Sequence, residues 1–150
     1  MVILRVLLNV IIDDYRFRWD EISFELDKVI KFYENYGINI FYFRRIREPF
    51  IGINLHFCEP NGSQAYLFQK KALITYNDWF KYRYQRLGLL LHELNHAIFK
   101  LPDHYEGSDY YIPTLEPCVM KDMNILTFCS SCLHHVENTI FVIILPLING

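Results

Sequence analysis

The sequence predicts one domain of the α+β class, in which a mixed, twisted β-sheet packs against two helices and a loop-rich segment follows. The chain has 150 residues, a length typical of a single domain with its own core. Hydrophobic residues make up 52% and charged residues 21% of it, which is the balance of a globular protein. Short β-branched and aromatic segments also alternate with two longer segments of helical periodicity.

The first strand and the first helix are predicted by their apolar patterns. Val2 to Ile12 is almost continuously apolar, so we expect a strand buried on both faces near the centre of the sheet. From Trp19 to Tyr36 the apolar residues recur every three or four positions before Gly37. This spacing predicts an amphipathic helix that covers one face of the sheet.

The middle of the chain supplies the remaining strands. Ile38 to Phe43, Ile51 to Phe57 and Ala65 to Tyr76 are rich in Ile, Phe, Tyr and Leu, which favours strands and their connections. Turn signals separate them at Glu48-Pro49 and Pro60-Asn61-Gly62.

A second helix is predicted from about Trp79 to Phe99, where a broad apolar stripe returns. Its last third contains His92 to His96, with the sequence HELNH. We therefore assign residues 1–101 to the sheet and this helix.

A long loop should follow, because periodicity is lost for about 20 residues after Pro102 and loops of that length often carry function. From Leu133 a short helix and an apolar tail should complete a C-terminal subdomain over 102–150. The apolar run Thr139 to Ile148 contains Pro146 and is shorter than the roughly 20 residues that cross a bilayer. We expect this run to be buried in the protein.

Charge and the N-terminal sequence argue against several partners. A net charge of −2 with scattered basic residues disfavours binding to nucleic acid, and the run Arg44, Arg45 and Arg47 is interpreted as a solvated strand end. The first residues lack the small-residue cleavage site of a signal peptide. We expect a cytoplasmic protein without a membrane partner, whose cysteines are reduced.

The HELNH segment has the residue types of a catalytic zinc site. Residues four apart lie on one face of a helix, so His92 and His96 can direct two imidazoles at one ion. Catalytic zinc usually has three protein ligands and a water whose pKa it lowers toward neutrality. Glu93 is placed to take the proton of that water as the general base.

The third ligand is expected just after the helix. Pro102 cannot continue a helix and disfavours helical geometry at Leu101, so Asp103 and His104 can fold back toward the ion. Histidine is the commoner zinc ligand, whereas ligation by Asp103 would leave His104 for another task.

Three of the four cysteines lie close together, at Cys118, Cys129 and Cys132. A CSSC pair with a third cysteine nearby favours a metal site, although thiol pairs can also be redox active or merely buried. Cys58 stands apart and is interpreted as a small core residue.

These motifs together resemble the archaemetzincins of the metzincin clan. The resemblance rests on HELNHAIFKLPDH, on CVM at Cys118 to Met120 and on CSSC at Cys129 to Cys132, and it covers roughly the last 60 residues. It implies a zinc peptidase with an HExxHxxGxxH motif, a methionine turn beneath the metal formed here by Met120, and a second, structural zinc site completed by CxxC.

The sequence departs from that family at the helix exit. Phe99 stands where the family has a glycine, and the family's third ligand falls on Pro102, so one extra residue is needed to deliver Asp103 or two to deliver His104. The family's cysteine directly after the third ligand is also missing.

Two arrangements of the ligands follow from these departures. In one, Asp103 joins His92 and His96, and His104 completes the second zinc site with the three cysteines. In the other, which we favour from the sequence, His104 is the third catalytic ligand and His134 or His135 completes the second site.

The function expected from the sequence is hydrolysis of a peptide or protein substrate. A peptide would add as an antiparallel strand along Gln64 to Gln69, with Glu93 acting on the water. The alternative is a zinc-stabilised binding module without activity, which a closed site with both Asp103 and His104 on the first ion would favour. A thiol redox protein using Cys129 and Cys132 is a weaker alternative.

Overall fold

The computed structural model describes residues 4–59, 63–66, 70–108 and 110–149. Its centre is a sheet of five strands in the order β2-β1-β3-β5-β4. The strands are β1 (Leu4–Ile12), β2 (Ile38–Arg45), β3 (Ile53–Cys58), β4 (Gln64–Tyr66) and β5 (Lys71–Thr75). The expected turn at Pro60-Asn61-Gly62 lies outside the described residues.

The sheet is mixed, as the sequence predicts. Strand β1 runs parallel to both β2 and β3, and β3 runs parallel to β5. Strand β4 pairs antiparallel with β5 and forms the last strand of the sheet. The apolar first strand therefore lies inside the sheet, between two partners.

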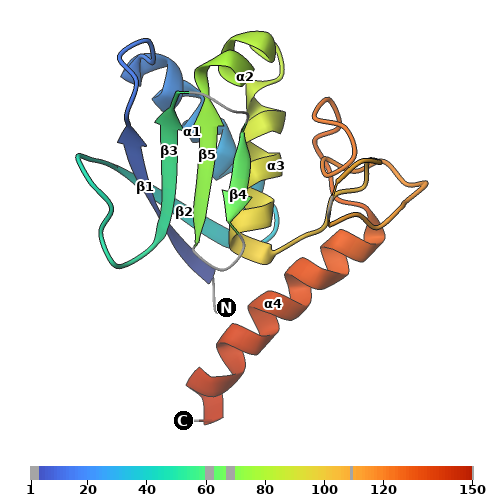
Figure 1. The fold of residues 1–150 in the computed structure, drawn as a ribbon. Coiled ribbons are helices and arrows are strands. Elements are labelled where there is room, and N and C mark those ends of the chain that lie inside the picture. The colour runs from blue at the N-terminus through green and yellow to red at the C-terminus, as the bar shows by residue number, and fades with distance from the viewer. Residues whose placement is uncertain (1–3, 60–62, 67–69, 109, 150) are drawn as a thin grey trace.

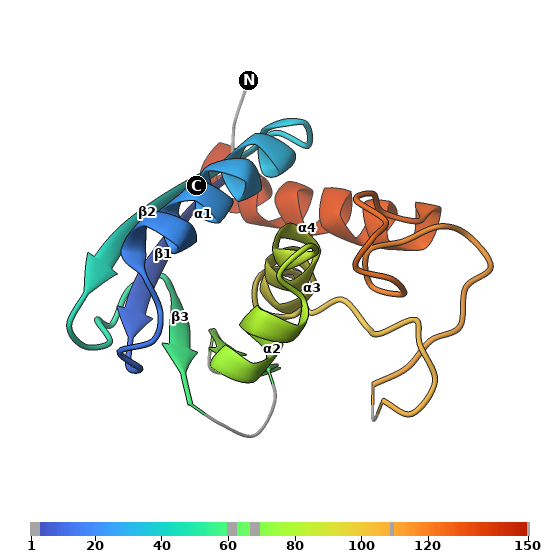
Figure 2. The same cartoon turned by 90° about the horizontal axis from the view of Figure 1, so that it is seen from above.

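In the described part of the chain, four helices accompany the sheet: α1 (Trp19–Glu34), α2 (Tyr76–Lys81), α3 (Arg86–Phe99) and α4 (Ser130–Asn149). Figure 1 shows α3 beside β4, and Figure 2 shows α1 and α3 on the same side of the sheet. The buried residues of α1, Ile22, Leu26 and Val29 among them, join the buried residues of the strands in one core. The apolar stripe of α1 is thus the face that covers the sheet.

The prediction of a single helix from Trp79 to Phe99 is wrong, because the structure has two helices there, α2 and α3. Helix α2 begins earlier than expected, since the Thr75 side chain accepts a hydrogen bond from the Asp78 amide and caps its N-terminus. Tyr82 leaves the helical conformation, and the Gln85 amide then bonds to the Tyr82 carbonyl. The turn between α2 and α3 allows the two helices to run in different directions.

The C-terminal helix is longer than the short helix expected from Leu133. Helix α4 has 20 residues, starts at Ser130 and includes Pro146. Near its start, Cys132 and Val136 are buried, and the His135 Nε2 lies 2.8 Å from the Phe99 carbonyl oxygen of α3. The burial expected for Thr139 to Ile148 concerns side chains that lie largely outside the described ones. Within the described part of the chain, no helix combines the length and hydropathy that a bilayer crossing requires.

Candidate metal centres

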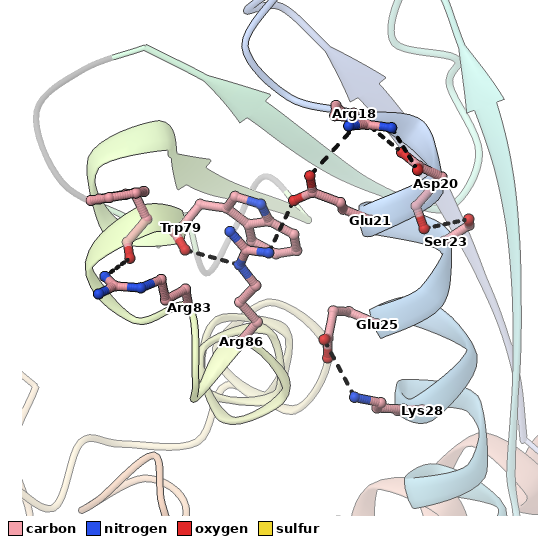
Figure 3. Close-up of polar contacts among 10 residues, drawn as sticks. Arg18, Asp20, Glu21, Ser23, Glu25, Lys28, Trp79, Arg83 and Arg86 are labelled. Carbon is pink, nitrogen blue, oxygen red and sulfur yellow. Dashed lines mark hydrogen bonds and ion pairs between the residues drawn. The ribbon is translucent and has the colours of Figure 1, made fainter.

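Helix α3 is fixed to its neighbours at its first residue. The Arg86 guanidinium forms a 3.0 Å ion pair with Glu21 of α1, donates a 3.0 Å bond to the Trp79 carbonyl of α2 and lies 4.3 Å from the Trp79 ring centroid. Figure 3 shows these contacts between three helices. Further along α3, the buried Asn95 Oδ1 accepts a 2.6 Å hydrogen bond from the Tyr33 hydroxyl of α1. Both contacts hold the helix that carries HELNH.

Three side chains converge on one point at the C-terminal half of α3. The Nε2 atoms of His92 and His96 each lie 2.8 Å from Asp103 Oδ1, and they lie 3.2 Å from each other. All three residues are buried. Atoms at these separations share a point roughly 2.0 to 2.2 Å from each, which is the length of Zn–N and Zn–O bonds. The three residues therefore fit a metal ion.

The other ring nitrogens fix the state of both imidazoles. His92 Nδ1 lies 3.2 Å from the Val119 carbonyl oxygen, and His96 Nδ1 lies 2.6 Å from the Leu101 carbonyl oxygen. A carbonyl can only accept, so Nδ1 carries a proton in each ring, and a neutral ring then presents its lone pair at Nε2. This is the tautomer that a metal ligand needs.

Three acceptors that face one another require positive charge between them. With Nδ1 protonated, both neutral Nε2 atoms and Asp103 Oδ1 all present lone pairs to the same point. Burial lowers the pKa of His92, but Asp103, Glu93 and the Val119 carbonyl raise it by more. Burial raises the pKa of Asp103, while its close contacts with His92, His96 and Ser108 hold it well below its usual range. The carboxylate is thus charged and ready for a cation.

The helix exit explains how Asp103 reaches this position although no glycine ends the helix. Lys100 follows the last residue of α3 and has φ 56°, a left-handed conformation in which its amide bonds to the His96 carbonyl. The helix therefore continues through Phe99, and the chain turns one residue later than a glycine at 99 would allow. This shift of one residue matches the extra residue that the sequence analysis required before the third ligand, and it brings Asp103 to the two histidines.

A neighbouring loop segment holds Asp103 in one orientation. The Ser108 hydroxyl donates a short hydrogen bond to Asp103 Oδ2, the oxygen that faces away from the histidines. The Asp103 amide and carbonyl also bond to the backbone of Tyr110 and Ile112. Asp103 can then offer only Oδ1 to an ion. Sequence reasoning missed Ser108, since a serine in a loop carries no specific signal.

Glu93 borders the same group and a cleft of about 800 Å³. The cleft is also lined by His92 and Tyr105, and the Tyr105 ring centroid lies 5.8 Å from that of His92. Glu93 is buried, and its Oε2 has no hydrogen-bond partner among the described residues. Burial raises the pKa of Glu93, an effect that His92 and His96 partly offset. An unpartnered buried carboxylate oxygen at a cleft is suited to bind a water molecule or a substrate proton.

A second group forms beside the first. The ligand atoms of His104, Cys118, Cys129 and Cys132 all lie within 4.8 Å of one another, and all four residues are buried. His104 Nε2 lies 3.1 Å from Cys132 Sγ and 3.5 Å from Cys129 Sγ. Tetrahedral zinc with one nitrogen and three sulfurs places its ligand atoms roughly 3.4 to 3.8 Å apart. The His104 Nδ1 faces the Ile112 carbonyl, which again leaves Nε2 free.

The thiols of this group need a cation to ionise together. All four cysteines of the chain are free. A hydrogen bond from Cys132 lowers the pKa of Cys118, and the same contact raises the pKa of Cys132. One negative charge is therefore shared by the pair, whereas a divalent ion stabilises several thiolates at once.

The structure corrects the arrangement that we favoured from the sequence. Asp103, rather than His104, joins His92 and His96, and His104 lies with the three cysteines. His134 and His135 belong to neither group, since His134 Nε2 meets Asn138 and His135 Nε2 meets the Phe99 carbonyl. The reason is geometric, because adjacent residues in the extended segment after Pro102 point to opposite sides.

The remaining motif residue lies between the groups. Met120 is buried in a turn in which the amides of Lys121 and Asp122 bond to the Cys118 carbonyl. The Met120 carbonyl accepts the His104 amide at 3.0 Å, and the neighbouring Val119 carbonyl accepts from His92. One short turn therefore orients a histidine of each group. Backbone contacts of this kind leave no trace in the sequence.

Comparison with known proteins gives one kind of match. No protein-family model matches the chain, and a search of curated proteins finds no relative. Among solved structures, the crystal structure of archaemetzincin from Methanopyrus kandleri matches with a TM-score of 0.61 and 16% sequence identity. The match covers 89% of this chain and 94% of that one. The chain therefore has a fold similar to that of archaemetzincin, as the HELNH, CVM and CSSC motifs predict.

Proposed function

We propose that the chain is a zinc-dependent peptidase in which His92, His96 and Asp103 hold the catalytic ion. The observation that carries this proposal is the convergence of three buried acceptor atoms within 3.2 Å of one another beside Glu93. Such a cluster is destabilising without a cation. Two imidazoles and a carboxylate with a free position are a typical ligand set of catalytic zinc.

The chain's own residues supply the remaining chemistry. A bound zinc ion would polarise a peptide carbonyl and lower the pKa of water at the site. Glu93 accepts the proton of the attacking water, and its buried side chain keeps that proton close until the leaving amine takes it. The pKa that burial raises makes the Glu93 carboxyl a better base than an exposed glutamate.

The second group is proposed to hold a structural zinc ion through His104, Cys118, Cys129 and Cys132. Four protein ligands make a closed site without a position for water. The group joins the segment after α3 to the turn at Met120 and to the start of α4. Met120 is proposed as the methionine turn, because its backbone lies next to both groups.

The division of Asp103 and His104 between the two groups favours an enzyme over a zinc-stabilised binding module. A module is expected to close its first site with a fourth protein ligand, and His104 was the candidate. In the structure His104 contacts Cys132 and Cys129 instead. The first group keeps three ligands and borders a cleft, which is the arrangement that catalysis needs.

The substrate is proposed to be a peptide that extends the sheet at β4. Strand β4 is the last strand of the sheet, and it pairs on one side with β5. Ser63, which precedes β4, lines the same cleft as Glu93. A peptide added antiparallel to this edge would run into the cleft. Of the segment Gln64 to Gln69 named from the sequence, residues 67–69 lie outside the described residues.

The test separates metal binding from catalysis. Glu93→Gln should retain zinc at the first group and lose peptidase activity on fluorogenic peptides by roughly 10²- to 10⁴-fold. Glu106→Gln, a change of the same kind at an exposed position, is the matched control and should keep wild-type activity. A zinc-loaded Glu93→Gln protein that cleaves at the wild-type rate would refute the assignment.

A further inference from the structure

The two faces of the sheet differ in what covers them. By register, Leu7, Phe41 and Phe43 share one face, and Leu8 and Tyr42 share the other. Tyr42 contacts α1, through a 2.7 Å hydrogen bond to Asp27 and through the Trp19 ring. The face with Leu7 therefore points away from the helices, which Figure 2 shows on one side of the sheet.

This outward face is apolar at the strand where water should meet it. Phe41 is 46% exposed and Phe43 is 54% exposed on β2, which among the described strands has a neighbour on one side only. A sheet face in water normally presents polar residues. Two phenylalanines at successive outward positions reverse that pattern.

The connection from β2 to β3 extends the apolar surface. It crosses the outward side of β1, because the Ile51 carbonyl accepts a 2.6 Å bond from Asn9 and a Cβ at Gly52 would lie 2.7 Å from the Leu7 carbonyl oxygen. Ile51 is 75% exposed, and Ile46 and Phe50 are fully exposed. Figure 1 shows this connection as a long loop at the β2 side of the sheet. We call Phe41, Phe43, Ile46, Phe50 and Ile51 the outward patch.

Two arginines border the outward patch. Arg45 pairs with Ile11 and therefore lies on the same outward face of β2 as Phe43, and Arg47 follows in the loop. Both are exposed, and neither forms an ion pair within the described part of the chain. The acidic residue of the loop, Glu48, is paired with His56 and Lys71. The patch is therefore apolar with an uncompensated positive rim.

We propose that the outward patch docks on the surface of an anionic lipid bilayer. Fully exposed apolar side chains can enter the interface between headgroups and acyl chains, while the arginines contact lipid phosphates. A second copy of the chain fits less well, since two positive rims would repel each other. A protein partner would need a concave surface to receive Ile46 and Phe50, whereas a bilayer needs none. This is attachment to a membrane surface, and it departs from our expectation from the sequence that the protein has no membrane partner.

The test is sedimentation with lipid vesicles. Wild-type protein should bind vesicles containing about one third phosphatidylglycerol and not vesicles of phosphatidylcholine alone, and salt should weaken the binding. Arg45→Gln/Arg47→Gln should weaken it roughly 25-fold, at about fivefold for each arginine. Lys81→Gln/Arg83→Gln, two exposed cations on and after α2, is the charge-matched control and should bind normally.

The contribution of the apolar side chains to vesicle binding is tested with a second pair of matched variants. Ile46→Ser/Phe50→Ser should abolish vesicle binding, whereas Tyr15→Ser/Leu115→Ser, which changes an equally exposed aromatic and aliphatic residue elsewhere, should not. Thermal unfolding confirms that each variant is folded. Binding that is absent, equal on neutral vesicles or unchanged in the Ile46→Ser/Phe50→Ser protein overturns the proposal. So does a dimer in solution that this variant dissociates, because the occupant would then be a second copy.

Discussion

Replacement of Gly88 by alanine should destabilise the protein, although Gly88 lies inside a helix. It occupies the first turn of α3, one turn before His92. A Cβ at this position would lie 1.9 Å from the Met123 carbonyl oxygen and 2.9 Å from the Met123 Cα. These atoms belong to the backbone that follows the Met120 turn, so no side-chain rotation can relieve the contact.

Two opposing effects decide the result of Gly88→Ala. Alanine favours a helix over glycine by about 1 kcal/mol. To restore an ordinary 3.4 Å contact, the Met123 carbonyl would have to retreat by about 1.5 Å, which is 3.4 minus 1.9. Overpacking of this kind costs about 1 to 3 kcal/mol and more when backbone must shift. Because backbone must shift, we expect the upper part of that range to apply, which leaves a net loss of about 2 kcal/mol in the free energy of unfolding.

Urea unfolding of zinc-loaded protein measures that loss, and competition with a chromogenic chelator measures zinc affinity. Because the displaced segment carries Cys118 and the Val119 carbonyl, Gly88→Ala should weaken zinc binding as well. Gly37→Ala is the control, since it has φ 74° with nothing within 4 Å of its Cβ. It should lower stability by about 1 kcal/mol and leave zinc affinity unchanged. A Gly88→Ala protein that is more stable than wild type would show that the loop does not pack against α3 as described.

Other changes test further contacts. Tyr33→Phe should cost about 1 to 3 kcal/mol of unfolding free energy, because the buried Asn95 Oδ1 loses its donor, and an undiminished urea midpoint would contradict this. Ser108→Ala should lower zinc affinity at the first group about 10- to 100-fold by releasing Asp103 Oδ2, as chelator competition can measure. Removal of zinc by a chelator should make the segment between α3 and α4 accessible to protease before the sheet is cut, since the two metal groups hold that segment. An unchanged digestion pattern would contradict this.

The sequence predicted the elements whose periodicity agrees with their burial. The apolar segment ending at Ile12 forms β1 inside the sheet, and the stripe from Trp19 forms α1. The division between α2 and α3 was missed, because the apolar stripe continues across it and the break is a backbone turn from Tyr82 to Gln85. Local turn formation competes with periodicity, and periodicity alone cannot show which prevails.

The histidines of the helix were predictable from their spacing, since two residues four apart must share a helix face. The choice between Asp103 and His104 was not, because it depends on where the helix ends. Lys100 takes a left-handed conformation that is uncommon for a residue with a side chain. A shift of one residue at that turn would exchange the roles of the two candidates. A glycine at this position would have indicated the turn in the sequence, whereas a lysine gives no such signal.

Anomalous scattering at the zinc absorption edge, measured on crystals of the zinc-loaded protein, tests the central claim most directly. We expect two ions, one bound by His92, His96 and Asp103 with a position open to the cleft, and one bound by His104 and the three clustered cysteines. Absence of an ion between His92 and His96, or an ion there that is closed by His104, would contradict it.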